Sequence, residues 1–289
     1  MVNCLIVNKL QTINKDIMAV TMAEISKLRT MTGAGMMDCK NALIEADSDF
    51  EKAVEIIRKK GQAVAAKRSD REASEGCVLA ASNGGFAAVL ALKCETDFVA
   101  KNVEFIALTQ SILDVALTQK PANLANLNAL IISGKTVSEL IVERIGVTGE
   151  KMELDFYEFV EGVSTAAYIH PGNKLATLVA FAEKGVEYQV GRDVAMQAAA
   201  MNPVSLDRSS VPQKVIDTEL EIGRDKARQE GKPENMLDKI AQGRLNKFFQ
   251  DSTLLEQAFI KDSKITVADY LKSNSATAVS FKRVTLNQE

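Results

Sequence analysis

The spacing of hydrophobic positions changes along the chain, and the first stretch has helical spacing. Between residues 22 and 62 apolar side chains recur every three or four positions, as on one face of a helix. TGAG at 32–35 interrupts the first helix, and DSD at 47–49 can cap a third that ends near Gly61. Residues 22–62 therefore predict a three-helix module, followed by a charged helical tail or linker at 63–74.

Beyond the linker the spacing becomes that of strands, and one pattern occurs twice. EGCVLAASNGGFAAVLAL begins at Glu75, and EGVSTAAYIHPGNKLATLVAF begins at Glu161. Each copy has Glu-Gly, a strand, a glycine-containing hairpin turn, a second apolar strand and then a helical pattern. The repeat predicts two related α+β subdomains, one at 75–160 and one that starts at 161.

Two further helical patterns interrupt the second subdomain. GKP at 231–233 separates them, which predicts an antiparallel helical hairpin over 213–250. The second subdomain then comprises 161–212 and 251–289, and its alternating last segment is expected to return to that subdomain's sheet. The fold class predicted for the whole chain is α+β.

The first 21 residues fit none of these patterns. Their apolar stretch is cut by Asn3, Asn8 and Lys9, and no small-residue cleavage site follows, so they make a poor signal peptide. Met18 and Met22 both qualify as start residues. We expect residues 1–21 to be an extension or an upstream mis-start.

Composition and charge narrow the function classes. The formal charge of −3 disfavours a nucleic-acid partner, and no apolar run approaches the ~20 residues of a membrane span. The four cysteines form no C-x-x-C pair, which indicates reduced thiols in a cytoplasmic protein. A single histidine excludes a multi-histidine metal site, and no phosphate-loop or nucleophile-elbow motif occurs. We therefore expect no enzyme, cofactor or metal.

The candidate chemistry lies after the apolar run FAAVLAL, where the chain presents Thr96, Asp97, Phe98 and Val99. Two interpretations stand open on these residues alone. Thr96 or Asp97 can cap the following helix, with Phe98 on the same face as Phe105, seven residues later, as part of the core. Alternatively, Phe98 is offered to another molecule. Composition favours the core, since large aromatic residues are usually buried.

Four motifs occur in the same order in a known family. They are TGAGMMDCKNAL, ETDFVAKN, IHPGNKLATLVAF and EGKPENMLDKIAQGRLNKFF. From about Met22 onward the chain resembles bacterial elongation factor Ts, the guanine-nucleotide exchange factors of elongation factor Tu. The resemblance implies a ubiquitin-associated-like N-terminal module, a two-subdomain α+β core and an inserted coiled-coil hairpin.

The resemblance also implies roles for particular residues. Thr96, Asp97, Phe98 and Val99 match the family's loop that displaces Mg²⁺ from the partner, where the acid–aromatic pair is wedged between helices of the GTPase domain. This reverses the preference for a core position of Phe98.

Two other positions are implied to touch the same partner. His170 matches a histidine that the family places against the GTPase. One of Met36 and Met37 must face inward, and the other is a candidate contact, because the family's N-terminal module docks on the GTPase domain.

The function implied is guanine-nucleotide exchange by binding elongation factor Tu, both GDP-bound and nucleotide-free, with GDP exchanged for GTP. No nucleic acid, membrane or cofactor is implied, and a homodimer within a heterotetramer stays open. Some family members carry a further helix after the last strand, whereas this chain ends in VTLNQE. The alternative is a helical adaptor that docks other proteins without exchange activity, and release of labelled GDP from elongation factor Tu separates the two.

Overall fold

The computed structural model describes residues 20–287 and has the mixed helix and strand content of an α+β fold, as predicted. Its contacts divide the chain into two compact units. The N-terminal unit holds the described residues up to Ala73 together with Ser138–Met152. The core unit holds Ser74–Val137 and the chain from Glu153 onward.

Three helices open the N-terminal unit, namely α2 (Met22–Thr32), α3 (Met36–Glu45) and α4 (Phe50–Lys67). Thr21 caps α2 through its hydroxyl, which accepts a hydrogen bond from the Glu24 amide at 3.2 Å, and the Glu24 carboxylate accepts one from the Thr21 amide at 2.8 Å. Val20 packs partly against the apolar core of these helices. The module therefore begins at Val20, before the expected boundary at 22, and residues 1–19 of the expected extension lie outside the described part.

Helix α4 does not end near Gly61 as expected but continues to Lys67. The start of the 63–74 segment is therefore helical, which was one of the two alternatives for it. The reason is a close contact with α8 (Val137–Thr148). A Cβ added at Gly146 would lie 2.7 Å from the Gly61 Cα, so this glycine brings two backbones together rather than ending a helix. Ser138–Met152 accordingly groups with the N-terminal unit and not with the rest of the expected 75–160 subdomain.

The core unit contains two three-stranded sheets that follow the repeat. The first sheet has the order β1-β2-β5 and the second β10-β7-β6. Gly84 and Gly85 join β1 to β2, whose register pairs Glu75 with Cys94. The last strand pairs with β7, as expected from its alternation. The strands are β1 (Glu75–Asn83), β2 (Phe86–Cys94), β5 (Met152–Glu161), β6 (Ser164–Ile169), β7 (Leu175–Phe181) and β10 (Ala278–Thr285).

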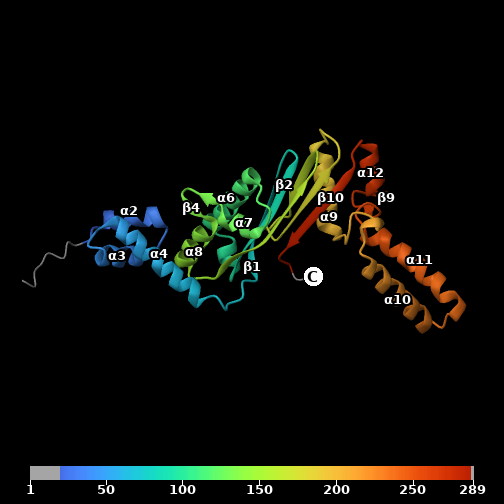
Figure 1. Cartoon of the computed structure of the whole chain (residues 1–289), viewed down its shortest axis with the longest axis horizontal. Helices are drawn as coiled ribbons and strands as arrows, with labels where there is room; N and C mark the ends of the chain where they lie inside the picture. Colours follow the sequence, from blue (N-terminus) through green and yellow to red (C-terminus); the bar gives the residue numbers. More distant parts are fainter. Residues whose placement is uncertain (1–19, 288–289) are drawn as a thin grey trace, which may run out of the picture. The chain divides into compact units, whose positions relative to one another are not determined.

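The two sheets share one apolar cluster, in which alanines of β2 and β7 are prominent. Ala87 and Ala91 of β2 belong to it together with Ala176 and Ala180 of β7. Small side chains let the sheets come close. Helix α6 (Val103–Gln119) contacts β1 and β2, and α9 (Tyr188–Met201) contacts β6 and β7, so each sheet carries one long helix (Figure 1).

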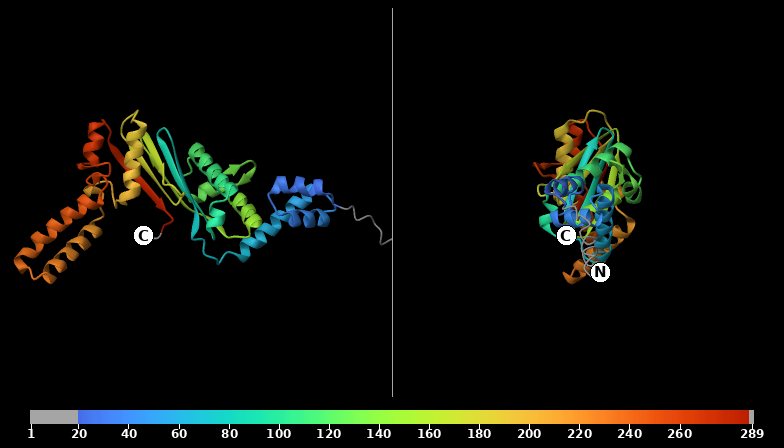
Figure 2. Two further views of the ribbon diagram at one scale, coloured as in Figure 1. Left: turned by 180° about the vertical axis from the view of Figure 1, so that it is seen from behind. Right: turned by 90° about the vertical axis from the view of Figure 1, so that its left-hand side faces the viewer.

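Helices α10 (Gln213–Gln229) and α11 (Glu234–Ser252) form a helical hairpin. They lie side by side and are connected by a turn that contains GKP (Figure 2). A Cβ added at Gly223 would lie 3.0 Å from the Ala241 Cα, so small residues set the spacing of the two helices. The remaining elements are α5 (Asp97–Ala100), α7 (Leu124–Ala129), β3 (Ile131–Ile132), β4 (Lys135–Thr136), η1 (Arg208–Ser210), β8 (Ala258–Phe259), β9 (Asp262–Thr266) and α12 (Val267–Ser273).

Candidate partner-binding site

Phe98 lies on the surface, with 84% of its area exposed, whereas Phe105 is fully buried at 0%. The two do not share a face because the chain forms two helices here rather than one. Helix α5 ends at Ala100, and Asn102 starts α6 by accepting hydrogen bonds from the Glu104 and Phe105 amides at 2.9 and 3.4 Å. The core position weighed for Phe98 is therefore wrong.

The exposed ring is carried on a short helix that local contacts hold in place. Thr96, and not Asp97, is the cap, since its hydroxyl accepts a hydrogen bond from the Val99 amide at 3.4 Å. The Cys94 thiol, at the end of β2, donates to the Thr96 carbonyl at 3.2 Å. Ala100 is 8% exposed and anchors the inner side of α5. Phe98 thus stands on a fixed support.

Asp97 forms an ion pair within the same helix. The Lys101 ammonium donates to its carboxylate at 2.6 Å, and this bond holds the pKa of Asp97 below its usual range. Asp97 in turn raises the pKa of Lys101, and the charge of Glu75 adds a smaller contribution in the same direction. Lys101 was not predicted from the sequence, although its i,i+4 spacing to Asp97 is the signal that could have identified it.

His170 lies exposed at the start of the turn that joins β6 to β7. Its amide donates to the Leu175 carbonyl at 2.8 Å, and the turn places Asn173 in the left-handed region at φ 54°. The Tyr168 hydroxyl lies 3.1 Å from His170 Nδ1, and the two rings meet edge to face. Tyr168 was not predicted from the sequence either, although residues two apart on a strand share a face.

The structure brings the 95–102 loop and the 170–174 turn to the same end of the core unit. Glu75 opens β1 beside Cys94 of β2, and it forms an ion pair with Lys174. Three residues along β1, the Val78 amide donates to the Asn173 carbonyl at 2.7 Å. The start of β1 therefore contacts both segments.

Met36 and Met37 open α3 in the N-terminal unit. Met36 packs partly against that unit's core, while Met37 is 64% exposed. One of the pair thus faces inward, as expected, and Met37 is the one available for contact.

Within residues 20–287 no group of three or more histidine, cysteine or acidic side chains could hold a metal ion, and no helix has the length and apolarity needed to cross a bilayer. Cys39, Cys77 and Cys94 are buried, and burial raises the pKa of the Cys77 thiol to about 11.

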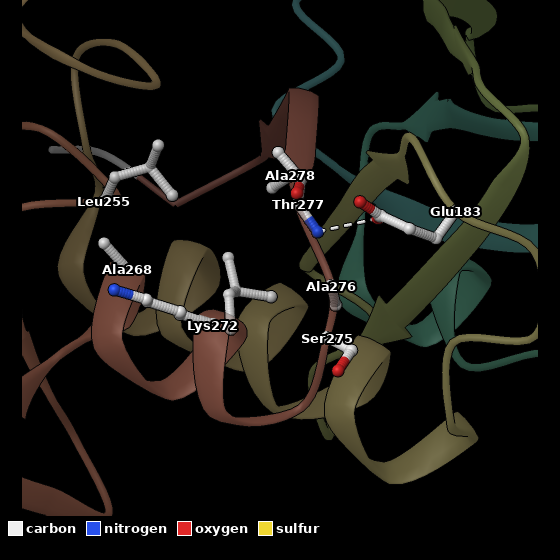
Figure 3. A pocket seen from close by; sticks show the side chains of 9 residues that line it. Glu183, Leu255, Ala268, Lys272, Ser275, Ala276, Thr277 and Ala278 are labelled. Carbon is white, nitrogen blue, oxygen red and sulfur yellow. Dashed lines mark hydrogen bonds between the residues drawn. The ribbon is translucent and has the colours of Figure 1, made fainter.

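A cavity of about 360 Å³ opens beside α12, but it includes none of the candidate residues (Figure 3). Most of the residues that line it are alanine and leucine. Its one carboxylate, Glu183, accepts a hydrogen bond from the Thr277 amide at 2.8 Å and so holds the segment before β10. This volume is at the small end for a ligand pocket.

Comparison with known proteins gives one consistent result. Residues 95–288 match the profile of the family described as Elongation factor TS. The chain is 62% identical over 275 residues to "Elongation factor Ts" of Porphyromonas gingivalis, covering 94% of this chain and 100% of that relative. It is 54% identical over 274 residues to that of Azobacteroides pseudotrichonymphae, covering 94% and 100%. For Christiangramia forsetii the identity is 48% over 273 residues, covering 92% and 98%.

Proposed function

The chain belongs to the elongation factor Ts family, and on that premise we propose that it binds elongation factor Tu and promotes release of GDP. It acts in the elongation cycle of translation in the cytoplasm, on the GDP-bound and the nucleotide-free partner, and GTP then replaces GDP. Binding, rather than bond chemistry, carries the function.

The observation that carries this proposal is an aromatic ring that is 84% exposed on a short, capped helix. Covering a large exposed apolar side chain with a partner makes the free energy of binding more favourable. A fixed support removes most of the entropic cost of ordering that side chain on binding. Phe98, with Asp97 beside it, is therefore suited to enter a crevice between helices of the GTPase domain.

Such a wedge can weaken nucleotide binding from a distance. GDP is held mainly through its phosphates and Mg²⁺, so a shift of the partner's helices that displaces the metal leaves phosphate charge uncompensated. Preference for the nucleotide-free partner is the required thermodynamic feature. By linkage, GDP then weakens the binding of the exchange factor by the same factor.

His170 and Met37 complete the proposed contact surface. Both are exposed, and His170 is held by Tyr168. Thr96 and Val99 act by fixing the helix that presents Phe98.

The test is the release of labelled GDP from purified elongation factor Tu. The chain should accelerate release, and Phe98→Ala should lose about 2 kcal/mol of binding, roughly thirtyfold in affinity for the nucleotide-free partner. Val103→Ala is a matched control, because Val103 is apolar and 79% exposed but lies outside the loop. Unchanged GDP release on addition of the chain would overturn the proposal and favour an adaptor.

A further inference from the structure

Four charged side chains of alternating sign lie where β1 begins. Asp97 pairs with Lys101 at 2.6 Å on the 95–102 loop, and Lys174 of the 170–174 turn pairs with Glu75. The charge of Glu75 also acts on Lys101, where it adds to the effect of Asp97 in raising the pKa of that lysine. Glu75 therefore attracts one cation from each segment.

The backbone explains why these groups meet. Glu75 is the Cα partner of Cys94, and α5 starts three residues after Cys94. On the other side, the Val78 amide fixes Asn173 at 2.7 Å, next to Lys174. Glu75 and Lys174 keep only 31% and 32% of their side-chain area exposed, so solvent screens their attraction less than that of a fully exposed pair.

We propose that Glu75 is a positioning residue that couples the 95–102 loop to the 170–174 turn, so that Phe98 and His170 are presented to the partner as one preformed surface. The inference rests on the proposed function. The Glu75 carboxylate pairs with Lys174 and its charge also acts on Lys101, so removing that charge removes an attraction common to both segments. Two contacts held in register bind better together than two contacts that move independently.

The test is a double-mutant cycle on the full chain, read as the rate of stimulated GDP release from elongation factor Tu. Phe98→Ala and His170→Ala are measured singly and together, first in the native background and then with Glu75→Gln, which keeps the shape and removes the charge. In the native background the combined loss should be smaller than the product of the single losses, by about threefold. With Glu75→Gln the two losses should multiply.

Glu158→Gln is the matched control, because it removes an ion pair with Lys282 that involves neither segment. It should leave the native coupling intact. Multiplicative losses in the native background, or a coupling that persists with Glu75→Gln, would overturn the inference and leave the proposed function standing. If neither single substitution slows GDP release, Phe98 and His170 do not form the contact surface and the inference fails. The proposed function fails only if the native chain does not accelerate release.

Discussion

The two copies of the strand–turn–strand–helix pattern solve the same packing problem, but one of them contains an additional element. In copy one, β1 and β2 lead through α5 to α6, and in copy two, β6 and β7 lead to α9 without a helix between. Both copies bury the second strand against a long helix. Copy two has no counterpart of α5, so the pattern that the copies share does not account for this helix.

Copy two also exposes an aromatic residue, Tyr188, at 78%. It sits on the first turn of α9 itself, and Glu187 before it makes no side-chain cap. Phe98 differs because it stands on a separate helix with its own cap. An exposed aromatic on a separate, capped helix that copy two lacks is the stronger sign of a partner.

The largest expected effect concerns what the copies share. Phe105→Ala in α6 and Phe181→Ala in β7 remove rings that are 0% and 1% exposed, and each should cost roughly 3–5 kcal/mol of unfolding free energy. Chemical denaturation monitored by circular dichroism measures both. A cost below about 1 kcal/mol for either would show that the two copies are not held by equivalent cores.

A smaller effect should distinguish the copies. A Cβ added at Gly191 of α9 would lie 2.8 Å from the Ala166 Cβ, whereas α6 contains no glycine. Gly191→Ala should therefore destabilise by about 1–3 kcal/mol through overpacking. Gly243→Ala is the control, because nothing lies within 4 Å of a Cβ added there on α11. It should raise the unfolding free energy by about 0.5–1 kcal/mol. Equal effects of the two substitutions would contradict the close approach of α9.

The boundary between α5 and α6 gives the next prediction. Asn102→Ala removes the cap that starts α6 and should cost about 1 kcal/mol. Glu187→Ala, at the uncapped start of α9, should change stability far less. Thermal unfolding of both variants measures the difference, and equal losses would remove this distinction between the copies.

The smallest effect is on the Asp97–Lys101 pair. Its bond to Lys101 places the pKa of Asp97 below the ordinary value of 3.8, so Lys101→Met should raise that pKa toward 3.8. The pKa of Asp97 is lower in the folded chain than in the unfolded chain. The pair therefore stabilises the loop at pH values above the ordinary pKa, and this stabilisation is lost as pH falls through the lowered pKa. Carbon NMR of the carboxyl groups follows the titration.

Asp269 serves as the control in the same titration, since its pKa is lowered mainly by Thr266 and should not respond to Lys101→Met. An Asp97 pKa that stays unchanged in the variant would contradict the role given to Lys101.

The sequence predicts the elements that repeat, but it does not predict how those elements are connected or which distant residues they contact. Alternation and turn residues predicted the two strand hairpins, and the GKP break predicted the helical hairpin. Seven-residue spacing placed Phe98 beside Phe105, because periodicity assumes one continuous helix and Asn102 ends that continuity. Gly61 was mistaken for a helix end because its partner, Gly146, is remote in sequence. The Glu75–Lys174 pair was out of reach for the same reason.

The central claim is that Phe98 serves binding while Phe105 serves folding, and measuring the stability and exchange activity of Phe98→Ala tests it most directly. Because its ring is 84% exposed, the variant should unfold within about 0.5 kcal/mol of the native chain. GDP release from elongation factor Tu at limiting concentration should nevertheless slow by roughly thirtyfold. A loss of stability close to that of Phe105→Ala, or full exchange activity in a stable variant, would contradict the account.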